Sequence, residues 1–99
     1  MQLKNFIWKS PDGESYIIRV AKDGKHKYYV EIGNKKIYFG ALPYEHFYDK
    51  LGFYKDLNHN DEDRRKAYKS RHGAIKNKDG TPSYKIPGTP AYFSWHILW

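Results

Sequence analysis

His59 and Asp61 have the residue types and the spacing that come closest to a catalytic or metal-binding site. Asp56 precedes them and His72 follows in the same region of the chain. A metal-dependent nuclease would use His as a base or ligand and carboxylates around Mg²⁺. The spacing matches no nuclease signature, and a His-x-Asp pair just before a helix more often forms an N-terminal cap. Catalysis by His59 and Asp61, with His72, is therefore the third of three functional hypotheses.

A block of positive charge begins three residues after Asp61 and includes His72. Residues 64–78, the basic segment, contain seven Lys or Arg and no carboxylate, whereas the whole chain has 18 Lys or Arg and 11 Asp or Glu. The rest of the chain has 11 basic and 11 acidic residues, so the formal net charge of +7 is confined to the basic segment. A local excess of this kind is typical of proteins that bind polyanions.

The basic segment has a spacing that suits phosphate binding if it is helical. Arg64, Tyr68 and Arg71 would share one face, and Arg65 and His72 would lie beside Tyr68 on the next. Arg binds phosphate bidentately, Lys adds charge, and Tyr can stack on a base or donate a hydrogen bond to phosphate. We predict weakly specific binding to the nucleic-acid backbone, with a slope of log K against log salt of about −4 to −5 for about five contacts with duplex DNA. The predicted binding residues are Arg64, Arg65, Tyr68, Lys69, Arg71, Lys76 and Lys78.

Two other interpretations of the basic segment remain open. Acids at the start of a helix and bases at its end complement the helix dipole, so the charges could form a solvated face. Alternatively, Arg64 and Arg71 could pair with carboxylates inside the fold, such as Asp56 or Asp61, in a structural polar network. The dipole explains the order of the charges but not their excess, because the cations continue into the loop that follows the helix.

The C-terminal stretch TPAYFSWHILW carries an aromatic stripe. Tyr92, Trp95 and Trp99 are spaced i, i+3 and i+7, which puts them on one side of a helix. Such a stripe could dock on the sheet and complete the core of a small domain. It could also bind a partner protein or a second copy of the chain, since Trp and Tyr are frequent anchors at interfaces.

Residues 1–40 have the pattern of a β-meander. Four runs rich in β-branched and aromatic residues are separated by turn pairs such as Asp12-Gly13, Asp23-Gly24 and Gly33-Asn34, which allow the positive φ of tight hairpins. The runs are LKNFIWK, SYIIRVA, KYYVEI and KKIYFG. Alternation in the third run predicts an apolar face (Tyr28, Val30 and Ile32) and a face toward water (Lys27, Tyr29 and Glu31).

Residues 41–99 are expected to contain helices and loop. The pattern of residues 43–52, with Pro43 near the start and Gly52 at the end, predicts a short helix with Phe47 and Leu51 facing inward. A second helix should run from an N-cap at Asn60 or Asp61 to Gly73, residues 74–88 should be loop, and a final helix should begin at Thr89-Pro90. The sequence therefore predicts a single α+β domain, residues 1–99, whose four-stranded antiparallel sheet is covered by two or three short C-terminal helices.

The composition narrows the class of protein. Cysteine is absent, which excludes disulfides and thiolate metal sites, and we expect no metal or cofactor. No apolar run approaches the about 18 residues of a membrane span, and the first ten residues lack the apolar core of a secretory signal. We expect a soluble intracellular protein with no membrane partner. Its ten Tyr, five Phe and three Trp should form a small, aromatic core.

Several motifs in residues 27–99 form one pattern. They are the hairpin end KKIYFG, Tyr54 and Asp56, His59 and Asp61, the RR-x-x-Y-x-x-RH block, Thr89-Pro90 and the terminal FSW-x-x-LW. This pattern resembles a largely uncharacterised family of small proteins of nucleocytoplasmic large DNA viruses and some phages. The stretch ALPYEHFYDKLG is a departure from it. The resemblance implies a viral or phage origin, hence the host cytoplasm or nucleus or a virion, and it implies no reaction.

Three functional hypotheses follow. The first is a small basic viral or phage protein that binds nucleic acid without catalysis. The second is a structural virion protein or a protein-interaction module, such as an inhibitor of a host factor, anchored through Tyr92, Trp95 and Trp99. The third is the nuclease that uses His59 and Asp61. We favour a protein that is not an enzyme.

Overall fold

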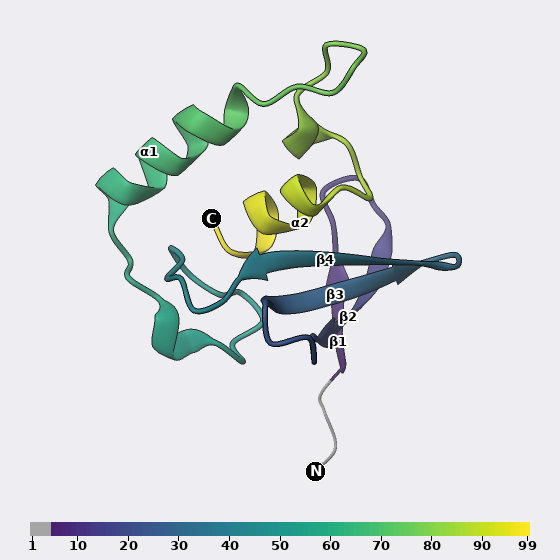
Figure 1. The fold of residues 1–99 in the computed structure, drawn as a ribbon, viewed down its shortest axis with the longest axis horizontal. Helices are drawn as coiled ribbons and strands as arrows, with labels where there is room; N and C mark the ends of the chain where they lie inside the picture. Colours follow the sequence, from purple (N-terminus) through teal and green to yellow (C-terminus); the bar gives the residue numbers. More distant parts are fainter. Residues whose placement is uncertain (1–4) are drawn as a thin grey trace.

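A computed structural model describes residues 5–99, in which four strands precede two α-helices (Figure 1). The strands pair in the order β1-β2-β3-β4, all antiparallel, which confirms the α+β class and the predicted meander. Residues 3 and 4 of the first predicted strand lie outside the described residues. The elements are β1 (Asn5–Lys9), β2 (Ser15–Val20), β3 (His26–Ile32), β4 (Lys35–Ala41), α1 (Glu62–Gly73), α2 (Pro90–Ile97) and two 3₁₀ turns, η1 (Lys55–Leu57) and η2 (Ser83–Lys85).

The core lies between the sheet and α2, which packs beside β4 (Figure 1). Alternate residues of β2 to β4 point toward α2, because successive side chains of a strand face opposite sides. Phe93 stacks on Phe39, with ring centroids 5.6 Å apart, and meets Tyr16 edge to face at 5.1 Å. The buried core residues are Ile18, Val20, Tyr28, Val30, Phe39, Tyr92, Phe93, Ile97 and Leu98.

The helix α2 begins where the sequence predicts. Thr89 is its N-cap, and the Thr89 hydroxyl accepts a hydrogen bond from the Tyr92 backbone N–H at 3.2 Å. Pro90 occupies the first turn, where its missing N–H costs nothing. No helix within residues 5–99 has the length and apolar composition that crossing a bilayer requires.

The prediction of a helix over residues 43–52 is wrong. This segment is irregular and partly extended, and its backbone N–H groups bond to distant carbonyls. The Tyr48 and Lys50 N–H groups donate to the Leu98 and Ile97 carbonyls, each at 3.1 Å, and the His46 N–H donates to the Leu57 carbonyl. The last carbonyls of α2 have no hydrogen-bond partner within the helix. They accept hydrogen bonds from residues 43–52 when this segment is extended, which stabilises the extended form over a local helix.

The interior of this segment is polar. His46 and Asp49 are the buried residues here, whereas the predicted inward residues Phe47 and Leu51 are only half-buried. The buried Asp49 carboxylate accepts hydrogen bonds from the Tyr28 hydroxyl and from the Leu51 and Tyr54 backbone N–H groups. Asp49 therefore fixes the segment against β3.

Gly40 allows an unusually close approach at the end of β4. A Cβ at this position would lie 2.9 Å from Leu98 Cδ1 and 3.2 Å from Lys27 Cβ. At Gly33, which also has positive φ, nothing lies within 4 Å of an added Cβ. Gly40 therefore lets Leu98 and the Lys27 stem pack directly against the β4 backbone.

We expect Gly40→Ala to lower the free energy of unfolding by about 1–3 kcal/mol more than Gly33→Ala, because only the first substitution overpacks the core. Both variants carry the strain of a side chain at positive φ, with φ of 76° at Gly40 and 60° at Gly33, so the difference isolates the contact with Leu98 and Lys27. Chemical denaturation of the two variants measures it. Equal losses would contradict the close packing at Gly40.

Candidate functional site

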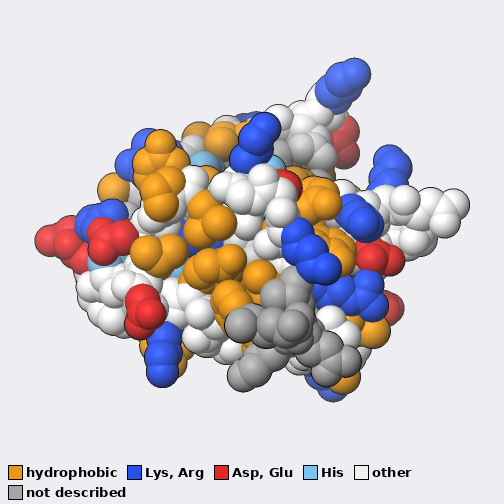
Figure 2. Space-filling model, turned by 60° about the horizontal axis from the view of Figure 1, so that its bottom comes forward, with side chains coloured by type: hydrophobic (Ala, Val, Ile, Leu, Met, Phe, Trp, Pro, Cys, Tyr) orange, Lys and Arg blue, Asp and Glu red, His pale blue; other side chains and the backbone are white. Residues whose placement is uncertain are grey.

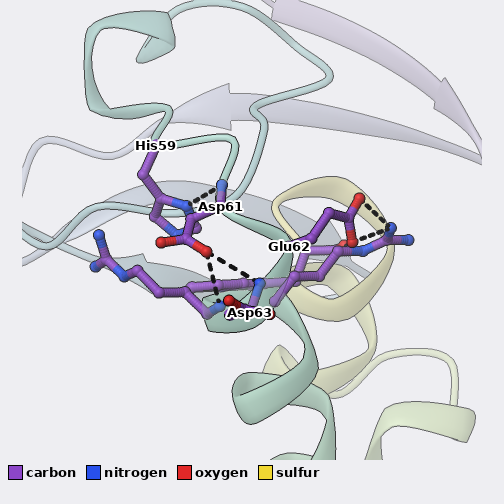
Figure 3. Close-up of polar contacts among 7 residues, drawn as sticks. His59, Asp61, Glu62 and Asp63 are labelled. Atoms are coloured by element: carbon purple, nitrogen blue, oxygen red, sulfur yellow. Dashed lines mark hydrogen bonds and ion pairs between the residues drawn. The ribbon is translucent and has the colours of Figure 1, made fainter.

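The predicted catalytic pair His59 and Asp61 forms the N-terminal cap of α1 (Figure 3). The Asp61 carboxylate accepts hydrogen bonds from the Asp63 N–H at 3.0 Å and the Arg64 N–H at 3.3 Å. His59 Nδ1 accepts one from the Asp61 N–H at 2.9 Å. The predicted N-cap at Asp61 and the predicted end of the helix at Gly73 are both confirmed.

The three candidate catalytic residues do not form one site. His72 stands eleven residues after Asp61, so it lies about 16 Å away along the helix axis. Burial, and then the charge of Arg64, lower the pKa of His59. Within residues 5–99 no three His, Asp or Glu side chains form a group that could hold a metal ion. The geometry therefore gives His59 and Asp61 a capping role.

Tyr68, predicted to stack on a base, anchors α1 to the C-terminus instead. It is the buried residue of α1, with 8% of its surface exposed. Its ring stacks on Trp99, with centroids 4.1 Å apart and planes 4° apart, and on His72 at 4.0 Å and 21°. Two parallel rings this close must cover opposite faces of Tyr68. The prediction that Tyr68 binds a base is wrong, because no free face is left for one.

The two arginines at the start of the basic segment make contacts within the fold. Arg64 pairs with Glu45 at 2.9 Å, and both side chains are about half exposed. Arg65 donates from Nε to the Trp99 carbonyl at 3.0 Å and lies over the Phe47 ring. The carboxylate partner of Arg64 is thus Glu45, not Asp56 or Asp61 as one sequence interpretation suggested.

The other five cations of the basic segment form no ion pair with residues 5–99. They are Lys66, Lys69, Arg71, Lys76 and Lys78. Lys66 and Lys69 line a shallow hollow along α1 together with Arg65 and its partner Glu62. Lys69 also lies 4.9 Å from the centre of the Trp95 ring. These cations keep most of the positive charge of the segment available to a ligand.

The fold adds two groups that sequence patterns did not single out. Lys50, in the segment wrongly predicted as helix, donates a hydrogen bond to the His96 carbonyl at the end of α2. Burial, and then the charges of Arg65 and Lys50, lower the pKa of Lys69. Burial, and then Lys50 and Lys69, lower the pKa of His96. The charges of Lys50, Arg65 and Lys69 therefore act on one another and disfavour the protonated form of His96, and we call Lys50, Arg65 and Lys69 the cationic cluster.

The predicted partner-binding residues Tyr92, Trp95 and Trp99 mostly contact the protein itself. Tyr92 is buried in the core, so its assignment to a partner surface is wrong. Trp95 stacks on Tyr84 with ring centroids 3.8 Å apart, and Trp99 stacks on Tyr68. The stripe joins α2 to α1 and η2, because a small domain with few aliphatic residues buries its aromatic ones.

Comparison of the chain with protein-family models, with curated proteins and with solved structures found no match.

Proposed function

We propose that this domain binds nucleic acid without catalysis, mainly through backbone phosphates. The observation that carries the proposal is the set of five basic-segment cations without a carboxylate partner in the described part of the chain. They continue from α1 into the loop that follows it, and one of them, Lys69, belongs to the cationic cluster. Like charges that repel one another destabilise the fold. Bound phosphates would neutralise this repulsion, and the protein cations would release counterions from the nucleic acid.

The proposal predicts backbone contact rather than reading of bases. Lys side chains carry charge without a fixed pattern of donors, and Tyr68 is not free to stack. Affinity for duplexes of different sequence should therefore be similar. The viral or phage setting, with the host cytoplasm or nucleus as the place of action, is part of this proposal on the strength of the sequence resemblance alone.

Exchanging Lys66, Lys76 and Lys78 together for Ala tests the proposal. All three side chains are exposed and none makes a polar contact within residues 5–99, so the fold should tolerate the change. We expect the slope of log K against log salt to become less steep by about 2.5, and binding at low salt to weaken about tenfold or more. Titration of a fluorescent duplex at several salt concentrations measures both.

The matched control removes the same charge from the sheet, by Lys22→Ala, Lys25→Ala and Lys35→Ala. These lysines are exposed in the hairpins between β2 and β4. An equal loss in both triple variants would mean that only net charge matters. Salt-independent binding, or none by the wild type, would contradict the proposal outright.

The alternative of a protein-interaction or structural virion module is favoured by a different observation. Ile7 and Ile17 are cross-strand partners on the outer face of β1 and β2, and they are 80% and 51% exposed. Figure 2 shows hydrophobic side chains gathered in the middle of one face, with both Lys or Arg and Asp or Glu around them. Exposed apolar side chains of this kind suit contact with a protein. Capture of one protein partner that Ile7→Lys/Ile17→Lys abolishes, without nucleic-acid binding, would favour this alternative.

A further inference from the structure

A cavity of about 370 Å³ lies between the end of β4, the segment after it, α1 and the end of α2. Its lining includes Lys27, Tyr44, Tyr68, Arg71, His72 and Ser94. Its volume lies at the lower end of the range of about 300–1,000 Å³ for small-molecule sites. Of the five unpaired cations of the proposed nucleic-acid surface, Arg71 lines the cavity, whereas the four lysines do not.

Lys27 is a buried cation in this cavity. The sequence predicts that it faces water, but only 2% of its surface is exposed, because Gly40 lets its stem pack against β4. Lys27 Nζ donates one hydrogen bond, at 2.7 Å, to the Tyr44 carbonyl. An ammonium group has three donors, and the other two have no partner among residues 5–99. Buried donors normally have partners, so this group lacks acceptors.

Lys27 keeps most of its positive charge although it is buried. Burial lowers the pKa of Lys27 to about 8, and attraction by Asp49 opposes this shift. The amine is thus still mostly protonated at pH 7. A buried, mostly charged group whose donors lack partners is the position at which an anion would bind most favourably.

Arg71 supplies a second cation at the rim of the same cavity. It is exposed, lies in the last turn of α1, and has no carboxylate partner in the described chain. Glu45, the acid in the lining, is already paired with Arg64. An Arg fork binds two oxygens of a phosphate, and a Lys adds a point charge.

We propose that this cavity binds the dianionic head of a phosphate monoester, with Lys27 Nζ at its floor and Arg71 at its rim. A terminal phosphate can enter a cavity and meet two cations with its three free oxygens. A phosphodiester inside a strand carries one charge and is flanked by sugars on both sides, so it fits a cavity that ends at Lys27, a residue with only 2% of its surface exposed, less well than a terminal phosphate does. The inference therefore does not rest on the proposed nucleic-acid binding.

Two sources share this chemistry, a phosphorylated small molecule and the 5′-phosphate end of a nucleic-acid strand. Ribose 5-phosphate with ribose as its control tests the first source. A 5′-phosphorylated tetranucleotide with its 5′-hydroxyl counterpart tests the second, because the internal phosphates are the same in both. Calorimetric titration of the wild-type protein with these four probes gives the affinity of each.

We expect at least one phosphorylated probe to bind with a dissociation constant below about 1 mM and at least about tenfold more tightly than its hydroxyl control. Lys27→Met keeps the packed stem and removes the amine, and Arg71→Gln changes an exposed residue that the fold does not need. Each should weaken binding about tenfold or more. Lys22→Ala, which removes an exposed cation outside both the cavity and the basic segment, should leave the preference for the phosphorylated probe unchanged.

The pattern across probes and variants decides the matter. Preference for ribose 5-phosphate that Lys27→Met and Arg71→Gln reduce supports a small-molecule ligand, and the same result with the tetranucleotide supports a strand end. Equal binding of phosphorylated and hydroxyl probes by the wild type would overturn the proposal. So would wild-type affinity in both variants, whose folding is checked by tryptophan fluorescence.

Discussion

Asp49→Asn should lower the free energy of unfolding by about 3 to 5 kcal/mol, the largest effect expected from any conservative substitution in this chain. Asp49 has 2% of its surface exposed, and its Oδ2 atom accepts from both the Tyr28 hydroxyl and the Tyr54 N–H. Oδ1 accepts from the Leu51 N–H at 2.9 Å. An amide nitrogen in place of Oδ2 cannot accept, so the Tyr54 N–H would face another donor.

The loss should be large because these hydrogen bonds involve a charged acceptor in the interior. Bonds to charged groups contribute about 1.5–3 kcal/mol each, and a buried donor left without a partner costs a similar amount. Burial, with the bond to Asp49, raises the pKa of Tyr28 far above its usual value, so this hydroxyl stays protonated as a donor. The total stability of a domain of this size is about 5–15 kcal/mol.

Thermal and chemical denaturation measure this loss, and Asp56→Asn is the matched control. Asp56 is exposed in η1 and its side chain forms no hydrogen bond or ion pair within residues 5–99. The control should change stability by less than about 0.5 kcal/mol. If Asp49→Asn unfolds together with the control, the buried hydrogen bonds of Asp49 do not hold the segment after β4 in place.

Lys27→Met should raise the free energy of unfolding at pH 7 by about 2 to 3 kcal/mol, provided that no anion is bound. The pKa of Lys27 falls from 10.5 to about 8 on folding, chiefly because of burial. One pKa unit corresponds to about 1.4 kcal/mol, so the charged amine costs the folded state about 3 kcal/mol. Methionine fills the same space without a charge, and loses only the bond to the Tyr44 carbonyl.

The sign of the pH dependence follows from the lowered pKa. Between pH 8 and 10.5 the unfolded chain holds the proton and the folded chain does not, so the wild type gains stability as pH rises. The advantage of Lys27→Met should therefore shrink by about 2 kcal/mol between pH 7 and pH 9.5. Other titrating groups, including the tyrosines, affect both proteins alike, so they cancel in the difference.

Urea denaturation of both proteins at pH 7 and at pH 9.5 provides the four values needed. Lys35→Met, at an exposed lysine of β4, controls for the loss of charge. A constant difference between wild type and Lys27→Met at the two pH values would mean that the amine is hydrated in the folded state. In that case the buried donors that support the anion cavity would also be absent.

The elements with strong local signals were predicted correctly. Tyr28 and Val30 alternate with polar neighbours, and Asp23-Gly24 permits the positive φ of the turn before them, so β3 and its hairpin are encoded within a few residues. The caps Asp61 and Thr89 each bond to N–H groups of their own first turn, which is why the starts of both helices were predictable.

The candidate site was only partly predictable. The sequence identified the charge of the basic segment, but it could not reveal that Tyr68 is covered on both faces or that Lys50 belongs to the cationic cluster, beside His96. One signal was available for Lys27. A Gly at the end of a strand pattern, as at Gly40, often marks a close approach, and here it brings the lysine stem inside.

By itself the sequence determined the meander, the two capped helices and the concentration of charge in residues 64–78, because hairpin turns, helix caps and net charge depend on neighbouring residues. Tertiary structure alone decided the course of the segment after β4 and the burial of Lys27. Both depend on the end of α2, whose carbonyls bind the Tyr48 and Lys50 N–H groups and whose Leu98 lies against Gly40. The end of α2 lies about fifty residues or more along the chain from Gly40, Tyr48 and Lys50. No local sequence pattern reports on contacts at that separation.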